Sequence, residues 1–114
     1  MESNELARAI VDIAEEKKAS NIVLLDIQHV SVIADYFVIC SGNSERQVKA
    51  IARDIEETLD KQEVSPRSKE GLDQGRWALL DYGDVIVHIF APVERDYYRL
   101  EKLWSNAQTV LIVQ

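Results

Sequence analysis

The segment 77–90, WALLDYGDVIVHIF, constrains the fold most strongly, because it predicts two antiparallel strands joined by a tight turn. A two-residue turn at Tyr82-Gly83 places Asp81 opposite Asp84 and divides the side chains between two faces. The first face has the apolar character of a protein core and holds Ala78, Leu80, Tyr82, Val85, Val87 and Ile89. The second face is chemically mixed and holds Trp77, Leu79, Asp81, Asp84, Ile86, His88 and Phe90. We therefore expect a sheet with one core face and one face of unusual composition.

Helical periodicity predicts three helices around this hairpin, over residues 4–18, 45–61 and 94–104. Ser3 or Asn4 precedes the first helix as a cap. Ser44 and Gln47 have capping-box spacing at the start of the second. The second helix carries one apolar face, which makes it the best defined of the three.

Short apolar runs predict strands over residues 21–27 and 36–40 before the hairpin. The run YFVIC at 36–40 is continuous, as in strands that are buried on both sides. Residues 64–70 contain Pro66 and several charges, so a strand there belongs at a sheet edge. The tail TVLIVQ is either a short strand or a loose terminus.

The order of these elements predicts an α/β fold with a mixed sheet of about five strands and helices mainly on one side. The opposite face of the sheet stays open in this arrangement, and the mixed residues of the hairpin lie on it. A chain of 114 residues has the size of a single domain. Within it we distinguish a domain at 1–104 from a C-terminal tail at 105–114.

The charge balance argues against direct tracking of nucleic acid. The chain has 20 acidic and 13 basic residues, for a formal net charge of -7. Phosphate backbones are bound mainly by Lys and Arg, so an acidic protein is repelled by them. The negative charge of the protein also attracts a basic protein surface, including the surface of a protein that itself lies on nucleic acid.

The chain shows no signal for export or membrane insertion. Cys40 is the only cysteine, so an intramolecular disulfide is excluded. The first twenty residues are acidic and helical in period, unlike a signal peptide, and no apolar run reaches the roughly 20 residues of a membrane helix. We expect a cytosolic protein or the mature domain of an organellar one.

The mixed hairpin face is best explained as a protein-binding surface. Trp77, His88 and Phe90 would expose a large apolar area, and such patches usually mark contacts with another macromolecule. Trp is also frequent among the residues that carry binding energy at interfaces. For Asp81 and Asp84 two interpretations stay open, a solvated turn or an acidic margin that meets a basic partner.

No catalytic constellation is evident. The turn SGNS at 41–44 lacks the spacing of a phosphate-binding loop, and capping the helix is its simpler role. Cys40 lies in an apolar strand and is expected to be a core residue, and His29 and His88 with one cysteine do not make a structural zinc site. The sequence implies no cofactor and no metal.

Four ordered motifs closely resemble the ribosomal silencing factor family, also called Iojap-like. They are ADYFVICSGNSERQ at 34–47, EG at 70–71, WALLDYGDVIVHIF at 77–90 and RDYYRLEKLW at 95–104. The resemblance implies a non-enzymatic translation factor with a nucleotidyltransferase-like fold that lacks the metal-binding acidic motif. Such factors bind the large ribosomal subunit through its basic protein uL14 and block joining of the small subunit when nutrients are scarce.

By analogy, the resemblance implies interface roles for residues of the hairpin and the third helix. These are Trp77 and Leu79 with Ile86 as apolar contacts, Asp81 and Asp84 as acceptors for Lys or Arg, and His88 and Tyr98 as flanking contacts. Tyr98 could instead pack the third helix, and Glu101 is more simply a solvated helical residue.

Two other interpretations stay open. One is a magnesium-dependent nucleotidyltransferase-like enzyme that uses Asp26, Asp35 or Asp81. The other is a homodimer. A dimer that buries the hairpin face would bring two acidic margins together, so a dimer through another surface is the better form of this interpretation.

Overall fold

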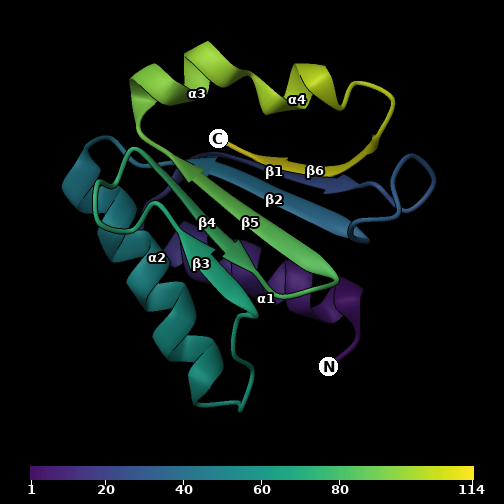
Figure 1. The fold of residues 1–114 in the computed structure, drawn as a ribbon, viewed down its shortest axis with the longest axis horizontal. Helices are drawn as coiled ribbons and strands as arrows, with labels where there is room; N and C mark the ends of the chain where they lie inside the picture. The colour runs from purple at the N-terminus through teal and green to yellow at the C-terminus, as the bar shows by residue number, and fades with distance from the viewer.

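Six strands form one mixed sheet in the order β3-β4-β5-β2-β1-β6 in the computed structural model, which describes residues 1–114 (Figure 1). The strands are β1 (Ser20–Asp26), β2 (Tyr36–Ser41), β3 (Ser68–Glu70), β4 (Trp77–Asp81), β5 (Val85–Phe90) and β6 (Gln108–Val113). Only β2 and β5 pair in parallel, and the other neighbours are antiparallel. The predicted α/β fold with a mixed sheet is confirmed, and the tail adds a sixth strand beside β1.

Four helical segments flank the sheet: α1 (Ser3–Glu16), α2 (Glu45–Asp60), α3 (Pro92–Tyr98) and α4 (Leu100–Leu103). The cap of α1 is Glu2, which forms a capping box with Glu5, so the helix begins one residue before the predicted position. Ser44 caps α2 as predicted, since its hydroxyl accepts the N–H of Gln47 at 3.1 Å. No helix has both the length and the apolar character needed to cross a membrane.

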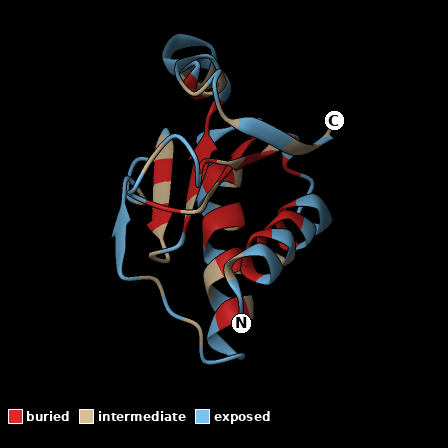
Figure 2. Cartoon of the chain, turned by 90° about the vertical axis from the view of Figure 1, so that its right-hand side faces the viewer, coloured by how far each residue is buried: buried red, intermediate tan, exposed pale blue.

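The main core lies between the sheet and the two long helices. Strand residues Val38, Cys40, Val87 and Ile89 are fully buried there, against the apolar faces of α1 and α2 (Figure 2). The predicted core face of the hairpin is confirmed, with Tyr82 half-buried at its margin. Burial also raises the pKa of the Cys40 thiol to about 12, because an apolar site disfavours the thiolate. Cys40 is thus a protonated core residue at neutral pH.

A second, smaller core covers part of the opposite sheet face, which was expected to be open. Phe37, Ile39 and Phe90 are buried there beneath Leu100 of α4. Trp104 packs edge-on against Phe37 with ring centroids 5.1 Å apart. The segment after β5 therefore folds back over the sheet, as Figure 1 shows for α3 and α4.

The predicted helix at 94–104 is divided into α3 and α4 at Arg99, which has a left-handed φ of 47°. Arg95 holds the two pieces in place, since its guanidinium donates to the Ser41 hydroxyl at 2.7 Å and to the Asn21 carbonyl at 2.8 Å. It also pairs with Glu101 at 2.5 Å. Glu101 is therefore not a freely solvated residue, but part of the contact that joins α3, α4 and the sheet.

The hairpin register differs from the predicted one by two residues. Trp77 lies opposite Phe90 and Asp81 opposite Ile86, so Asp81 and Asp84 do not face each other. The two-residue loop is Gly83-Asp84, closed by the N–H of Tyr82 on the Val85 carbonyl at 2.9 Å. Gly83 has a φ of 89° at the first loop position, where a tyrosine would be strained. The assignment of side chains to faces is unchanged, because a two-residue shift preserves the alternation.

Candidate partner-binding surface

The mixed face of the hairpin is half-buried at its centre and exposed at its turn. Trp77, Leu79 and Asp81 of β4 are half-buried, as is Ile86 of β5, and Asp84 is exposed. Tyr98 of α3 adds an exposed side chain beside them, with 42% of its surface accessible. We call Trp77, Leu79, Asp81, Asp84, Ile86 and Tyr98 the hairpin surface.

Trp77 is held in a fixed orientation by aromatic neighbours. Its ring lies 4.5 Å from that of Tyr98 and 4.9 Å from that of Phe90, centroid to centroid. These distances are in the range of favourable aromatic pairs. The structure therefore brings Tyr98 to the hairpin through Trp77, although the two residues come from different elements. The alternative role of Tyr98, which is to pack α3, is fulfilled by the same contact, because the Tyr98 ring joins α3 to Trp77 of β4.

His88 lies behind this surface rather than on it. The family resemblance implies a flanking contact with a partner for His88, but the imidazole is only 6% exposed because Phe37, Phe90 and Trp77 surround it. Its Nδ1 accepts a hydrogen bond from the Trp77 indole at 3.1 Å. The predicted exposure of Phe90 is also wrong, since that ring is fully buried.

Burial lowers the pKa of His88 from 6.5 to about 4, because the apolar surroundings disfavour the charged imidazolium. The ring is thus neutral at physiological pH. Since Nδ1 is the acceptor, the proton of the neutral ring is on Nε2. Nε2 is buried and has no hydrogen-bond partner within the chain. His88 supports Trp77 and adds no charge to the surface.

Two shallow recesses flank Trp77 on the side of the segment that follows β3. One is lined by Gly71, Gln74, Arg76, Trp77, Glu94 and Tyr98, and the other by Glu70, Gly71, Trp77 and Leu79. Gly71 has a φ of 75°, and a Cβ there would lie 1.9 Å from the Trp77 carbonyl oxygen. Only glycine allows this close approach. Its structural role was missed in the sequence, where the EG pair at 70–71 offered the only signal.

The acidic margin lies at one end of the sheet. Asp81 accepts the Gly83 N–H at 2.7 Å and so stabilises the turn with one carboxylate oxygen. The backbone of Asp35 is tied to the same turn, since its N–H donates to the Asp84 carbonyl at 2.8 Å. Asp26, Asp35, Asp81 and Asp84 therefore share this end, but no group of three or more His, Cys, Asp or Glu side chains is arranged to hold a metal ion.

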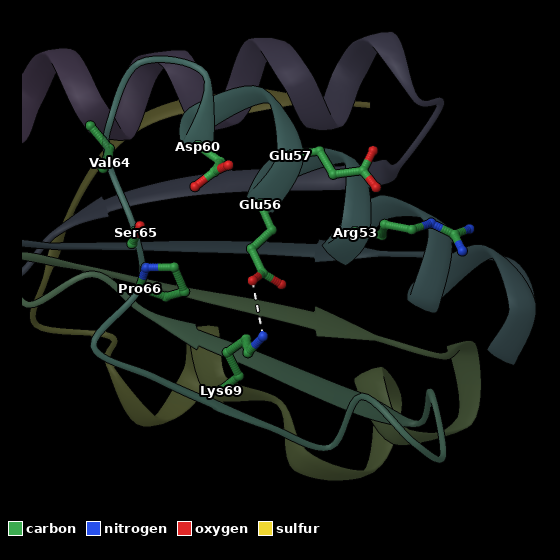
Figure 3. Close-up of a pocket in the computed structure, with 8 residues that line it drawn as sticks. All are labelled: Arg53, Glu56, Glu57, Asp60, Val64, Ser65, Pro66 and Lys69. Carbon is green, nitrogen blue, oxygen red and sulfur yellow. Dashed lines mark hydrogen bonds and ion pairs between the residues drawn. The ribbon is translucent and has the colours of Figure 1, made fainter.

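A separate hollow lies between α2 and the segment leading into β3, away from Trp77 (Figure 3). Its lining is almost entirely polar and consists of Arg53, Glu56, Glu57, Asp60, Val64, Ser65, Pro66 and Lys69. Lys69 and Glu56 form an ion pair of 3.0 Å across it, as Figure 3 shows. Both side chains are partly exposed, so the pair is weak and the hollow is a solvated groove.

A family model described as "Ribosomal silencing factor during starvation" matches residues 1–114. The chain belongs to this family. The resemblance carried by the four motifs is thus confirmed over the whole length, including the tail. The ribosomal silencing factor family consists of non-enzymatic regulators of translation that bind the large ribosomal subunit.

Two bacterial members of the ribosomal silencing factor family are similar to this chain along nearly their full length. The chain is 46% identical to the ribosomal silencing factor RsfS of Halalkalibacterium halodurans over 110 residues, which is 96% of this chain and 94% of that one. It is 44% identical to RsfS of Bacillus subtilis, covering 94% and 91% of the two chains. A crystal structure of a Chromobacterium violaceum protein matches with a TM-score of 0.89 and 35% identity, covering 92% of this chain and 88% of that one.

Proposed function

We propose that this chain binds the large ribosomal subunit through ribosomal protein uL14 and sterically blocks joining of the small subunit, repressing translation when nutrients are limiting. The observation that carries the proposal is the fixed, half-buried indole of Trp77 at the centre of the hairpin surface. A preorganised aromatic side chain in a partly apolar surface is the usual anchor of a protein interface. The proposed activity belongs in the compartment that holds ribosomal subunits, and we expect it in the cytoplasm.

The chemistry of the hairpin surface favours a basic protein partner. Leu79 and Ile86 extend the apolar area around Trp77, and Asp84 is exposed at its end. One oxygen of Asp81 is used by the turn, which leaves the other free to accept from a Lys or Arg. With a net charge of -7, the protein is attracted to a cationic surface and avoids long contacts with ribosomal RNA.

The proposed block is steric and depends on size and occupancy. The fold measures 34 × 34 × 23 Å along its principal axes. A body of these dimensions placed over an intersubunit contact excludes the small subunit from the same volume. Silencing then increases with the bound fraction, so affinity and abundance set its strength.

Sedimentation of the tagged protein with separated ribosomal subunits tests the first step. We expect it to sediment with the large subunit and not with the small one, and to reduce joined ribosomes when both subunits are mixed. A photo-crosslinking residue at Leu79 then tests the contact, with uL14 as the expected product. Binding without any effect on subunit joining would contradict the steric mechanism, and crosslinks confined to another ribosomal protein would contradict uL14 as the partner.

A further inference from the structure

The connection between β1 and β2 exposes an apolar tip. Val30 is 40% exposed, Ile33 is 58% exposed, and Val32 is fully exposed at 103%. We call these three residues the loop tip. Single apolar residues are common on protein surfaces, but three β-branched ones within four positions form a patch of the kind that marks a contact.

Hydrogen bonds hold the loop in one shape. At its base the Ile27 N–H donates to the Asp35 carbonyl at 2.9 Å, and the N–H groups of Val30 and Ser31 donate to the Ile27 carbonyl at 3.1 and 2.9 Å. The Ser31 hydroxyl accepts the Ile33 N–H at 3.1 Å. Such a turn presents its side chains with little conformational entropy left to lose on binding.

The loop tip has no place in the core of its own chain. Ile27 and Ala34, on either side of it, are buried in the smaller core. Both ends of the loop are thus anchored, while the side chains of Val32 and Ile33 between them are exposed to solvent. The exposure of Val32 and Ile33 is therefore a property of the packed fold and not of a loose segment.

The loop tip is continuous with the hairpin surface. Ala34 belongs to the same core as Ile86 and Trp77, which pack against it. The N–H groups of Asp35 and Tyr36 both donate to the Asp84 carbonyl, at 2.8 and 3.1 Å. Figure 1 shows the β1–β2 connection projecting at the same end of the sheet as the β4–β5 turn. A partner that covers the hairpin surface and its acidic end is therefore next to the β1–β2 loop as well.

We propose that the loop tip is a second anchor of the partner-binding surface, which inserts Val32 and Ile33 into an apolar recess of the basic ribosomal partner. This inference rests on the proposed function, because it assumes that the hairpin surface is the side that docks. A second copy of this chain fits the site less well. A two-fold contact there would bring this end of the sheet, with Asp26, Asp35, Asp81 and Asp84, against the same end of a second copy, and the like charges would repel.

The test compares three variants in large-subunit sedimentation: the double change Val32→Ser with Ile33→Ser, Trp77→Ala, and Ile112→Ser as a control. Ile112 is 59% exposed on β6, at the far edge of the sheet from the hairpin. We expect the double variant to bind at least about tenfold more weakly, equivalent to about 1.4 kcal/mol. We expect the control to bind as the unchanged protein does. The replaced side chains are exposed, so an unchanged melting temperature is expected for both serine variants.

The remaining outcomes separate this inference from the proposed function. If Trp77→Ala weakens binding and the double variant does not, the loop tip does not contact the partner, but the hairpin surface still does. If neither variant weakens binding, the hairpin surface is not the surface that binds the large subunit. The loss in the double variant should be equal at low and high salt, because the contact is apolar. A change from dimer to monomer in ultracentrifugation of the isolated double variant would assign the loop tip to a second copy and overturn the proposal.

Discussion

The indole nitrogen of Trp77 donates to Nδ1 of His88 at 3.1 Å, and this bond joins a half-buried aromatic side chain to a buried neutral imidazole. Trp77 lies opposite Phe90 and His88 opposite Leu79, so the bond runs diagonally between β4 and β5. This hydrogen bond orients the indole, while the imidazole that accepts the bond remains buried. The hairpin surface is consequently supported from beneath by a titratable group.

The first prediction concerns the pH dependence of stability at His88. Its pKa is about 4 in the folded chain against 6.5 ordinarily, so the unfolded chain binds the proton first as pH falls. The contribution of neutral His88 to the free energy of unfolding should be fully present above about pH 6.5. Up to about 3 kcal/mol of this contribution should be lost by about pH 4. Denaturant unfolding of the unchanged protein and of His88→Gln at several pH values measures this difference. His29→Gln, in the exposed β1–β2 loop, should behave as the unchanged protein; equal pH profiles for all three proteins would contradict the prediction.

The second prediction concerns Trp77 as an interface anchor. Trp77→Ala should weaken binding to the large subunit by at least about 2 kcal/mol, the cost typical of a central interface residue. The fold should persist, because Trp77 is only half-buried and lies outside the main core. Cosedimentation measures binding and circular dichroism measures folding. Undiminished binding by the folded variant would remove Trp77 from the interface.

The third prediction concerns the acidic margin. Asp84→Lys reverses an exposed charge at the hairpin turn and should weaken large-subunit binding, with a larger effect at low salt than at high salt. Asp12→Lys changes the charge equally on the exposed side of α1 and serves as the control. Asp84 suits this test better than Asp81, whose carboxylate also stabilises the turn. Equal effects of both variants would show that only net charge matters.

The fourth prediction concerns Gly71. Gly71→Ala places a methyl group 1.9 Å from the Trp77 carbonyl at a left-handed φ of 75°, so the chain must move or strain. We expect a loss of about 1–3 kcal/mol in the free energy of unfolding. Thermal or urea unfolding measures it, with Ser68→Ala in the exposed β3 strand as a control expected within about 0.5 kcal/mol. If Gly71→Ala is as stable as the control, the backbone around residue 71 can move to accommodate the methyl group without a loss in the free energy of unfolding.

Patterns in the sequence predicted most of the elements correctly. The continuous apolar run at 36–40 became the central strand β2, and the Ser44–Gln47 spacing correctly marked the start of α2. The alternation at 77–90 correctly separated the core face of the hairpin from its chemically mixed face. These features depend on local periodicity and capping, which neighbouring residues determine among themselves.

Other features depend on contacts between distant residues. The burial of Phe90 results from the return of α3 and α4 over the sheet, which Arg95 secures through Ser41 and Asn21. His88 is buried by rings that three different strands bring together, those of Phe37, Trp77 and Phe90. A hydrophobic pattern does not show which segment will cover a face. The single helix expected at 94–104 was wrong for a related reason, since the break at Arg99 lets Leu100 reach the second core.

The sequence by itself determined the four inner strands, the two long helices, the two faces of the hairpin and the family, because local spacing and motif order are sufficient for these. Only the tertiary structure decided the hairpin register, the supporting role of His88 and the projection of the loop tip. A strand pattern with a period of two is unchanged by a two-residue shift, and burial depends on which distant elements pack together. Only the folded chain brings those elements into contact.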